Sequence, residues 1–332
     1  MKKFRLYGVL GAFFLAGLVP LGSLEIRQGG VLLLLHENTG HFALYALNRD
    51  QKRYEPYFSY KDPSTSFIEL NINDQIFRLG ESPVFRVRIE NNAVTPAIIF
   101  DSTTLQVRQE FTFIQTAGSP EVNGIRITIR LINIQSRTIT VGMRVLFNTR
   151  IGSAFDKTPF FVNNQRITTE TLIAGGIGRY WISQGGRFPL MGSIGALSGD
   201  SPDYLHIADW ALLNESSWTS SPKSRAGSQA QAITDPAICY YYEPKTLRTA
   251  GETSFTIFLA IEDPAGFNGF RLSSDLPAIP ASLAQSLRAD LALLADITES
   301  LDRHTNGEIT LTQKELADME LIVTRIKELY SL

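Results

Sequence analysis

The sequence is poor in the side chains from which many functional sites are built. Its 332 residues include a single cysteine, Cys239, and four histidines. One cysteine excludes an intrachain disulfide and a zinc site built on several cysteines, so packing must stabilise the fold. The 31 basic residues do not outnumber the 33 acidic ones, so we expect no nucleic-acid partner. With 44% hydrophobic and 19% charged residues, the composition also excludes a disordered chain.

Long apolar runs are absent except at the start of the chain. Three basic residues within the first five precede an apolar run over residues 6–19, which ends at Pro20 and small residues. This order is typical of a signal peptide and predicts a leader over residues 1–23. The alternative is an uncleaved N-terminal anchor, because the run approaches the lower length limit for a membrane-spanning helix. Cleavage would leave a net charge of -5 and no integral membrane domain, so we expect a periplasmic or secreted protein.

The central region has the two-residue period of strands with one buried face. Ile and Leu alternate with Arg and Thr over residues 125–131, and the pattern returns over residues 139–147. Because only a short polar break separates the two runs, we interpret 124–148 as one long antiparallel hairpin. A further hairpin is predicted over 31–47, with Gly40 supplying a positive φ in its turn.

No amphipathic helix of ten or more residues interrupts the strand pattern, which makes parallel strands with crossover helices improbable. The predicted fold is therefore mainly β, with a large antiparallel β-sandwich over residues 24–272. A small-polar insertion over residues 214–234 is long enough to be functional.

The tail changes to a helical period. Prolines mark a linker over 273–280, and residues 281–331 predict a helix-loop-helix hairpin with a capping box from Thr312 to Glu315. Apolar residues three and four apart form a stripe on each helix. We expect these stripes to bind a protein partner through Leu287, Leu291, Leu294, Leu316, Met319, Val323 and Ile326.

The loop between the two helices resembles an EF-hand calcium loop. Asp302 and Asn306 occupy its first and fifth positions. The twelfth position, which supplies a bidentate Glu in that family, is Gln313, and the third is His304. We therefore predict no metal site and interpret the loop as a plain turn between helices.

Catalytic motifs are scarce in the sequence. It contains no Gly-x-Ser-x-Gly nucleophile elbow and no phosphate-binding loop followed by a helix, so we predict no catalytic residue and no cofactor. A carbohydrate site would combine aromatic rings with carboxylates, and the candidates for it are Trp181, Trp210, Trp218, Asp209 and Glu243. The competing interpretation is that these rings pack in the core, because half of the side chains on alternating strands face inwards.

Several segments resemble a pattern in poorly characterised exported bacterial proteins. They are Val141–Gly152 with the following Pro159-Phe-Phe, Ala208–Trp210, and Asp235–Pro244 with Gly251-Glu252. Such proteins look like β-sandwiches and are distantly similar to the supersandwich of aldose mutarotases. Mutarotases use paired histidines and a glutamate as acid and base, and we assign none of these to a position in this sequence. The resemblance implies an architecture and leaves the activity open.

Together, these patterns predict a non-catalytic, exported binding or scaffolding protein of the cell envelope. It would engage a protein partner through the hairpin at 281–331. The alternative is a carbohydrate-binding or sugar-modifying, mutarotase-like β-sandwich protein, for which the partner is a glycan.

Overall fold

The computed structural model divides the chain into two compact units, Met1–Asp275 and Leu276–Leu332. It describes residues 22–57, 63–92, 94–149, 160–162, 165–174, 180–184, 188–194, 201–216, 232–272, 293, 296–306 and 309–330. The predicted leader up to residue 21, the predicted linker 273–280 and most of the polar insertion lie outside these residues. In the part that is described, none of the helices combines the length and hydropathy needed to span a bilayer.

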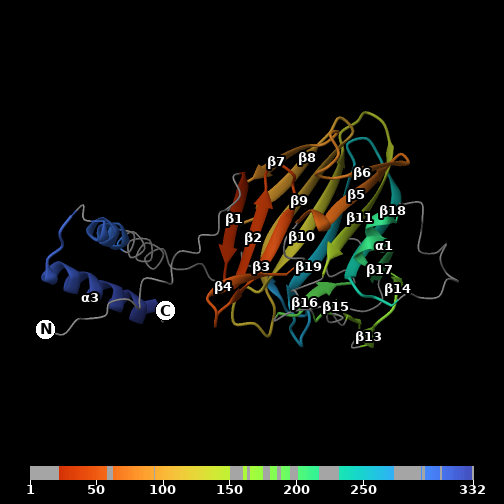
Figure 1. The fold of residues 1–332 in the computed structure, drawn as a ribbon. Coiled ribbons are helices and arrows are strands. Elements are labelled where there is room, and N and C mark those ends of the chain that lie inside the picture. Colours follow the sequence, from red (N-terminus) through yellow and green to blue (C-terminus); the bar gives the residue numbers. More distant parts are fainter. Residues whose placement is uncertain are drawn as a thin grey trace. The chain divides into compact units, whose positions relative to one another are not determined.

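The first unit consists of three antiparallel sheets (Figure 1). Together with the helical second unit, this confirms the predicted fold class, a mainly β, antiparallel sandwich with C-terminal helices. The largest sheet has ten strands. Nine of them follow one another in a linear hydrogen-bonded order, the main path, and β20 (Arg271–Leu272) pairs with β9 outside this order. Along that path the order is β13 (Gln165–Ile167), β12 (Phe160–Val162), β15 (Tyr180–Ser183), β16 (Leu190–Ser193), β19 (Glu252–Ile261), β10 (Gly124–Asn133), β9 (Leu105–Gln115), β8 (Ala97–Asp101) and β7 (Arg86–Glu90).

The six-stranded sheet carries the only α-helix among the described residues of this unit. Helix α1 (Trp210–Glu215) follows β17, and a short 3-10 helix, η1 (Pro63–Thr65), precedes β5. The strand order is β14 (Thr171–Ala174), β17 (Tyr204–Asp209), β18 (Pro236–Leu247), β11 (Ile139–Asn148), β5 (Phe67–Ile72) and β6 (Gln75–Arg78).

The four-stranded sheet lies at the start of the described chain. Its order is β1 (Ser23–Gln28), β2 (Val31–His36), β3 (Phe42–Asn48) and β4 (Arg53–Pro56). The pairing of β2 with β3 confirms the hairpin predicted over 31–47. Gly40 has φ 69° in its turn, and a Cβ at this position would lie 2.5 Å from the Phe100 ring. Both the backbone conformation and the close packing therefore require glycine here.

The hairpin predicted over 124–148 is wrong, although both of its strands form. Strand β10 pairs with β9 and β19 in the ten-stranded sheet, whereas β11 pairs with β18 and β5 in the six-stranded sheet. The polar break is thus an arch from one sheet to the other. Buried Asn133 holds the arch, because its side-chain amide donates to the carbonyl oxygens of Arg137, Leu247 and Arg248 at 2.8–3.1 Å. The apolar face of a strand can be buried whether the next strand in the chain is its hydrogen-bonded neighbour or lies in the facing sheet. Alternation alone therefore does not identify the partner strand.

The main core lies where the inner faces of the sheets meet. Phe42 of the four-stranded sheet has its ring centroid 5.0 Å from that of Phe111 on β9 and 6.5 Å from that of Phe147 on β11. Phe147 is in turn 5.9 Å from Tyr240 on β18. Edge-to-face rings of this kind bury large areas and favour one relative position of the sheets.

The second unit contains two helical segments among its described residues. Residues 296–305 are helical, and α3 (Gln313–Tyr330) follows a short loop. The capping box is confirmed, because the Glu315 amide donates to Thr312 Oγ1 at 3.2 Å and the Thr312 amide donates to Glu315 Oε2 at 2.7 Å. The Thr312 amide and hydroxyl both donate to the Glu315 carboxyl and lower its pKa.

Candidate functional site

The two described tryptophans among the sugar-site candidates do not share one surface. Trp181 is 0% exposed, and its indole nitrogen donates to the Tyr240 hydroxyl at 2.6 Å, so its ring lies between the ten-stranded and six-stranded sheets. The ring also stacks on Phe160 with centroids 5.3 Å apart. This environment is a packed core, in which a tryptophan needs a hydrogen-bond partner for its N–H.

Trp210 lies on the other side of the six-stranded sheet. It begins α1, donates its indole N–H to the Thr65 carbonyl at 2.8 Å and packs against a cluster that includes Cys239 and Tyr241. Neighbouring residues on a strand face opposite sides of the sheet, so Tyr240 faces the core with Trp181 while Cys239 and Tyr241 face Trp210. Trp218 lies outside the described residues.

The carboxylate of Asp209, one of the two candidates, is held by the backbone. Asp209 Oδ1 accepts hydrogen bonds from the amides of Thr234 and Asp235, both at 2.6 Å, which fixes the turn into β18. The exposed Glu243 uses its amide to donate to Asp203 Oδ2 at 2.7 Å. The structure therefore brings neither carboxylate together with both described tryptophans in one groove.

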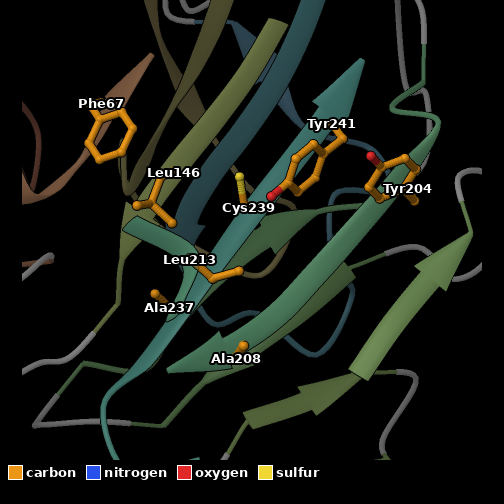
Figure 2. Packing of buried hydrophobic residues seen from close by; sticks show 8 residues of the cluster. All are labelled: Phe67, Leu146, Tyr204, Ala208, Leu213, Ala237, Cys239 and Tyr241. Atoms are coloured by element: carbon orange, nitrogen blue, oxygen red, sulfur yellow. The ribbon is translucent and has the colours of Figure 1, made fainter. Parts of the chain in front are cut away.

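A different arrangement of functional groups crosses the outward face of the six-stranded sheet. We call it the outward row, and its members are cross-strand neighbours on β6, β5, β11, β18 and β17: Arg78, Glu69, Arg144, Tyr241 and Tyr204. The two tyrosine rings stack with centroids 4.6 Å apart, and Figure 2 shows them beside Cys239. The structure buries most of this face, including the two charged residues at its centre.

The centre of the outward row is a buried ion pair. Arg144 Nε lies 2.5 Å from Glu69 Oε2, and the two side chains are only 1% and 7% exposed. Arg78 is 3.7 Å from the other carboxylate oxygen, and its guanidinium lies 3.8 Å from the centroid of the Phe67 ring. One carboxylate is thus shared by two guanidinium groups, which compensates part of the desolvation of the buried charges.

Arg144 also attaches α1 to the sheet. Its Nη1 donates to the Leu213 carbonyl at 3.0 Å and to Ser216 Oγ at 3.2 Å, at the C-terminal end of the helix. Burial alone would lower the pKa of Arg144, but interactions with Cys239 and Glu69 outweigh it and raise that pKa. A permanent cation at a helix C-terminus is favourable, so this arginine works as an anchor.

Cys239 lacks the properties of a reactive thiol. It is 0% exposed in the cluster of Figure 2, and burial raises its pKa to about 12 despite the opposing effect of Arg144. At neutral pH the group is therefore a neutral thiol, whereas the nucleophile and the metal ligand is the thiolate.

A histidine–carboxylate pair joins β17 to the residue that precedes β14. His206 on β17 is the cross-strand neighbour of Cys239, and its Nε2 lies 2.8 Å from Glu170 Oε1 just before β14. Histidine and glutamate are side chains that general acid–base catalysis uses. His206 is 3% exposed and the Glu170 side chain 15%, so the carboxylate is the more accessible member.

The cavity where the three sheets meet is too small for an organic ligand. It has a volume of about 20 Å³, and His41, Ser66 and Gln109 contribute polar groups to its lining. A single water molecule fills a space of this size. Sugar sites are far larger, typically several hundred Å³.

The predicted partner-binding residues are only partly described. Leu316, Met319 and Val323 are partly exposed on α3, and the neighbouring Leu321 is 70% exposed. The other four residues of the stripes fall outside what the structure describes, either entirely (Leu287, Leu291, Leu294) or in their side chains (Ile326).

The loop of the hairpin is organised by its own hydrogen bonds. Asp302 lies within the helical segment, and its carbonyl accepts a hydrogen bond from the Asn306 amide at 2.9 Å. His304 Nδ1 accepts from the Leu311 amide at 3.1 Å. Among the residues that can be described, no group of three or more His, Cys, Asp or Glu side chains is arranged to hold a metal ion.

Sequence reasoning missed the outward row and the His206–Glu170 pair. A signal for the first was present, because Glu69 and Arg144 are the charged residues of two strands that are rich in apolar residues. A charge in such a strand needs a partner charge in a neighbouring one. Nothing in the sequence places Glu170 beside His206, since the two lie 36 residues apart on strands whose pairing is set by the fold.

Comparison with known proteins gives only a distant similarity of fold. No family model matches the chain, and no curated protein matches it. A solved galactose mutarotase-like protein from Lactobacillus casei has 10% identity and a TM-score of 0.43, covering 73% of this chain and 100% of its own. The GalM/aldose epimerase homologue from C. elegans has 10% identity and a TM-score of 0.45, with 73% and 98% covered. A putative aldose 1-epimerase from Escherichia coli K12 has 10% identity and a TM-score of 0.42, with 72% and 98% covered.

Proposed function

We propose that this protein is a non-catalytic, exported scaffolding protein of the cell envelope, which binds a protein partner through its C-terminal helical hairpin. The observation that carries the proposal is the exposed apolar surface of α3. Leu321 is 70% exposed on one side of the helix, and Leu316, Met319 and Val323 are partly exposed on the opposite side. A helix that leaves this much apolar surface in water gains free energy by docking it against another protein.

The described part of the first unit supports a structural role. Arg144 and Glu69 neutralise each other in the interior, and Cys239 is a neutral thiol. The cavity between the sheets has room for about one water molecule. These features stabilise a platform and offer no substrate-sized site there.

Export is proposed from the order of residues at the start of the chain. Basic residues, then an apolar run and then small residues precede β1, which begins at Ser23. Cleavage near this point would leave nearly all of β1 in place, so the sheet that it edges would keep its register.

The test is deletion of residues 281–331, with the full-length tagged chain expressed in parallel in the source organism. We expect the leader to be absent from the purified protein and the deletion to abolish chemical cross-linking to envelope proteins. Tryptophan fluorescence controls for folding, because all three tryptophans lie within Met1–Asp275. If the folded, truncated chain still forms the same cross-linked products, the hairpin is not the binding element.

A second candidate, a sugar-modifying activity, is favoured by one observation, the His206–Glu170 pair. An imidazole 2.8 Å from a carboxylate could serve as acid and base for opening a sugar ring. Following the rotation of a freshly dissolved aldose with wild type and His206→Gln would test it. Acceleration by the wild type that the variant lacks would establish this activity, and equal rates would remove it.

A further inference from the structure

The apolar positions of α3 follow a heptad pattern. Positions 316, 319, 323, 326 and 330 alternate spacings of three and four and are all apolar or aromatic. In heptad notation they are a, d, a, d and a, which is the pattern of a helix that packs lengthwise against other helices. Side chains at 316, 319 and 323 are only partly buried within the unit.

The described side chains of this seam are not fully enclosed within the unit. Among the described side chains of Leu276–Leu332, Ile297 is the one hydrophobic residue in the buried class, at 6% exposure. Two helices expose one side of their shared seam to water, whereas four helices surround it. A second pair of helices would therefore complete the core that the hairpin begins.

The charges beside the seam indicate which helices these are. Glu320 follows the d position 319, and Lys327 occupies the same e position one heptad later. If two copies of α3 pack antiparallel with position 316 level with position 326, e positions face e positions, and Glu320 of each copy meets Lys327 of the other. A parallel arrangement would instead bring Glu315 beside Glu320 of the other copy, which is repulsive.

We propose that the partner of the hairpin is a second copy of this chain, and that two hairpins form an antiparallel four-helix bundle. This inference rests on the proposed function, because it names the partner of the same surface. The arrangement has two-fold symmetry, so the contact between Glu320 and Lys327 forms twice and no binding surface remains open to further copies. Burial of the seam supplies most of the affinity, while Glu320 and Lys327 determine the orientation and the choice of partner.

The test uses the full chain with single charge reversals and sedimentation velocity over a wide range of concentrations. We expect a dimer for the wild type. Glu320→Lys and Lys327→Glu should each raise the dissociation constant of the dimer roughly ten- to thirtyfold, because two attractive contacts become repulsive. Asp318→Lys is the matched control, since it reverses an exposed charge at an outer position and should leave the dimer unchanged.

Mixing the two reversed variants gives the sharpest result. A 1:1 mixture of Glu320→Lys and Lys327→Glu should recover the dimer, because opposite charges meet again at both contacts of the mixed pair. A monomeric wild type, or a mixture that stays monomeric, overturns the inference. If cross-linking to other envelope proteins still depends on the hairpin in that case, the proposed function stands with a different helical partner. If it does not, both fail.

Discussion

The buried ion pair of Arg144 and Glu69 allows a quantitative prediction about the stability of the first unit. Replacing Glu69 with Met leaves the Arg144 guanidinium, 1% exposed, beside neutral groups of Leu213, Ser216 and Tyr241 in place of its carboxylate partner. An uncompensated buried charge of this kind costs about 3–5 kcal/mol. With a urea m-value of about 3 kcal/mol/M, the unfolding midpoint should fall by roughly 1–1.7 M.

The two single variants should differ. Arg144→Met leaves Glu69 within 3.7 Å of Arg78, so its charge remains partly compensated and the loss should be about 2–3 kcal/mol. Glu69→Met combined with Arg144→Met removes both charges and keeps most of the volume, so it should be more stable than Glu69→Met alone. The positive coupling between the two sites is the quantity to be measured.

The assay is urea unfolding followed by tryptophan fluorescence. Trp210 lies on α1, which Arg144 attaches to the sheet, and Trp181 reports on the core between the sheets. A loss below about 1 kcal/mol for Glu69→Met would refute the reasoning, since it is far below the cost of a stranded buried charge. Additive losses in the double variant would refute it as well.

Three further predictions concern packing, pH and thiol reactivity. Gly192→Ala should lower the unfolding free energy by about 1–3 kcal/mol in the same assay, because the new Cβ would lie 2.3 Å from the Trp181 ring; an unchanged midpoint would contradict the packing described. Burial alone would raise the pKa of Asp263, but hydrogen bonds from Thr116, Ala265 and Gly118 outweigh it and lower that pKa, so the carboxylate stabilises the fold at neutral pH. The difference in unfolding free energy between the wild type and Asp263→Asn should therefore be largest above about pH 4 and vanish as the pH falls through the lowered pKa. A difference that is independent of pH would contradict a stabilising role of the carboxylate. Cys239 should react with an aromatic disulfide reagent only at the rate of unfolding, because it is 0% exposed with a pKa of about 12; immediate reaction of the native protein would show that the cluster is open.

Local pattern was enough to predict the strands but not their partners. Residues 125–131 and 139–147 alternate as expected, yet the structure places them in different sheets. The alternation records which side of a strand is buried, and this is the same whether the neighbour lies beside the strand or across the core. The capping box at Thr312 was predictable for the opposite reason, since all of its hydrogen bonds are made within four residues.

The candidate site shows the same division. The five glycan candidates were chosen by residue type, and the structure separates Trp181 from Trp210 by the thickness of a sheet. The outward row was not predicted, because Glu69 and Arg144 are 75 residues apart and meet only through the pairing of β5 with β11. Residue type identifies what a side chain can do, but position in the fold decides what it touches.

The sequence by itself determined the mainly β class, the β2–β3 hairpin, and the heptad stripe and cap of α3. Each of these depends on residues close together in the chain, whose periodicity and turn chemistry act locally. Tertiary structure alone decided that β10 and β11 belong to separate sheets, that Arg144 is buried, and that His206 meets Glu170. These outcomes depend on contacts between segments that are distant in the chain. The free energy of burying those segments together comes from many residues of the core and not from any one position.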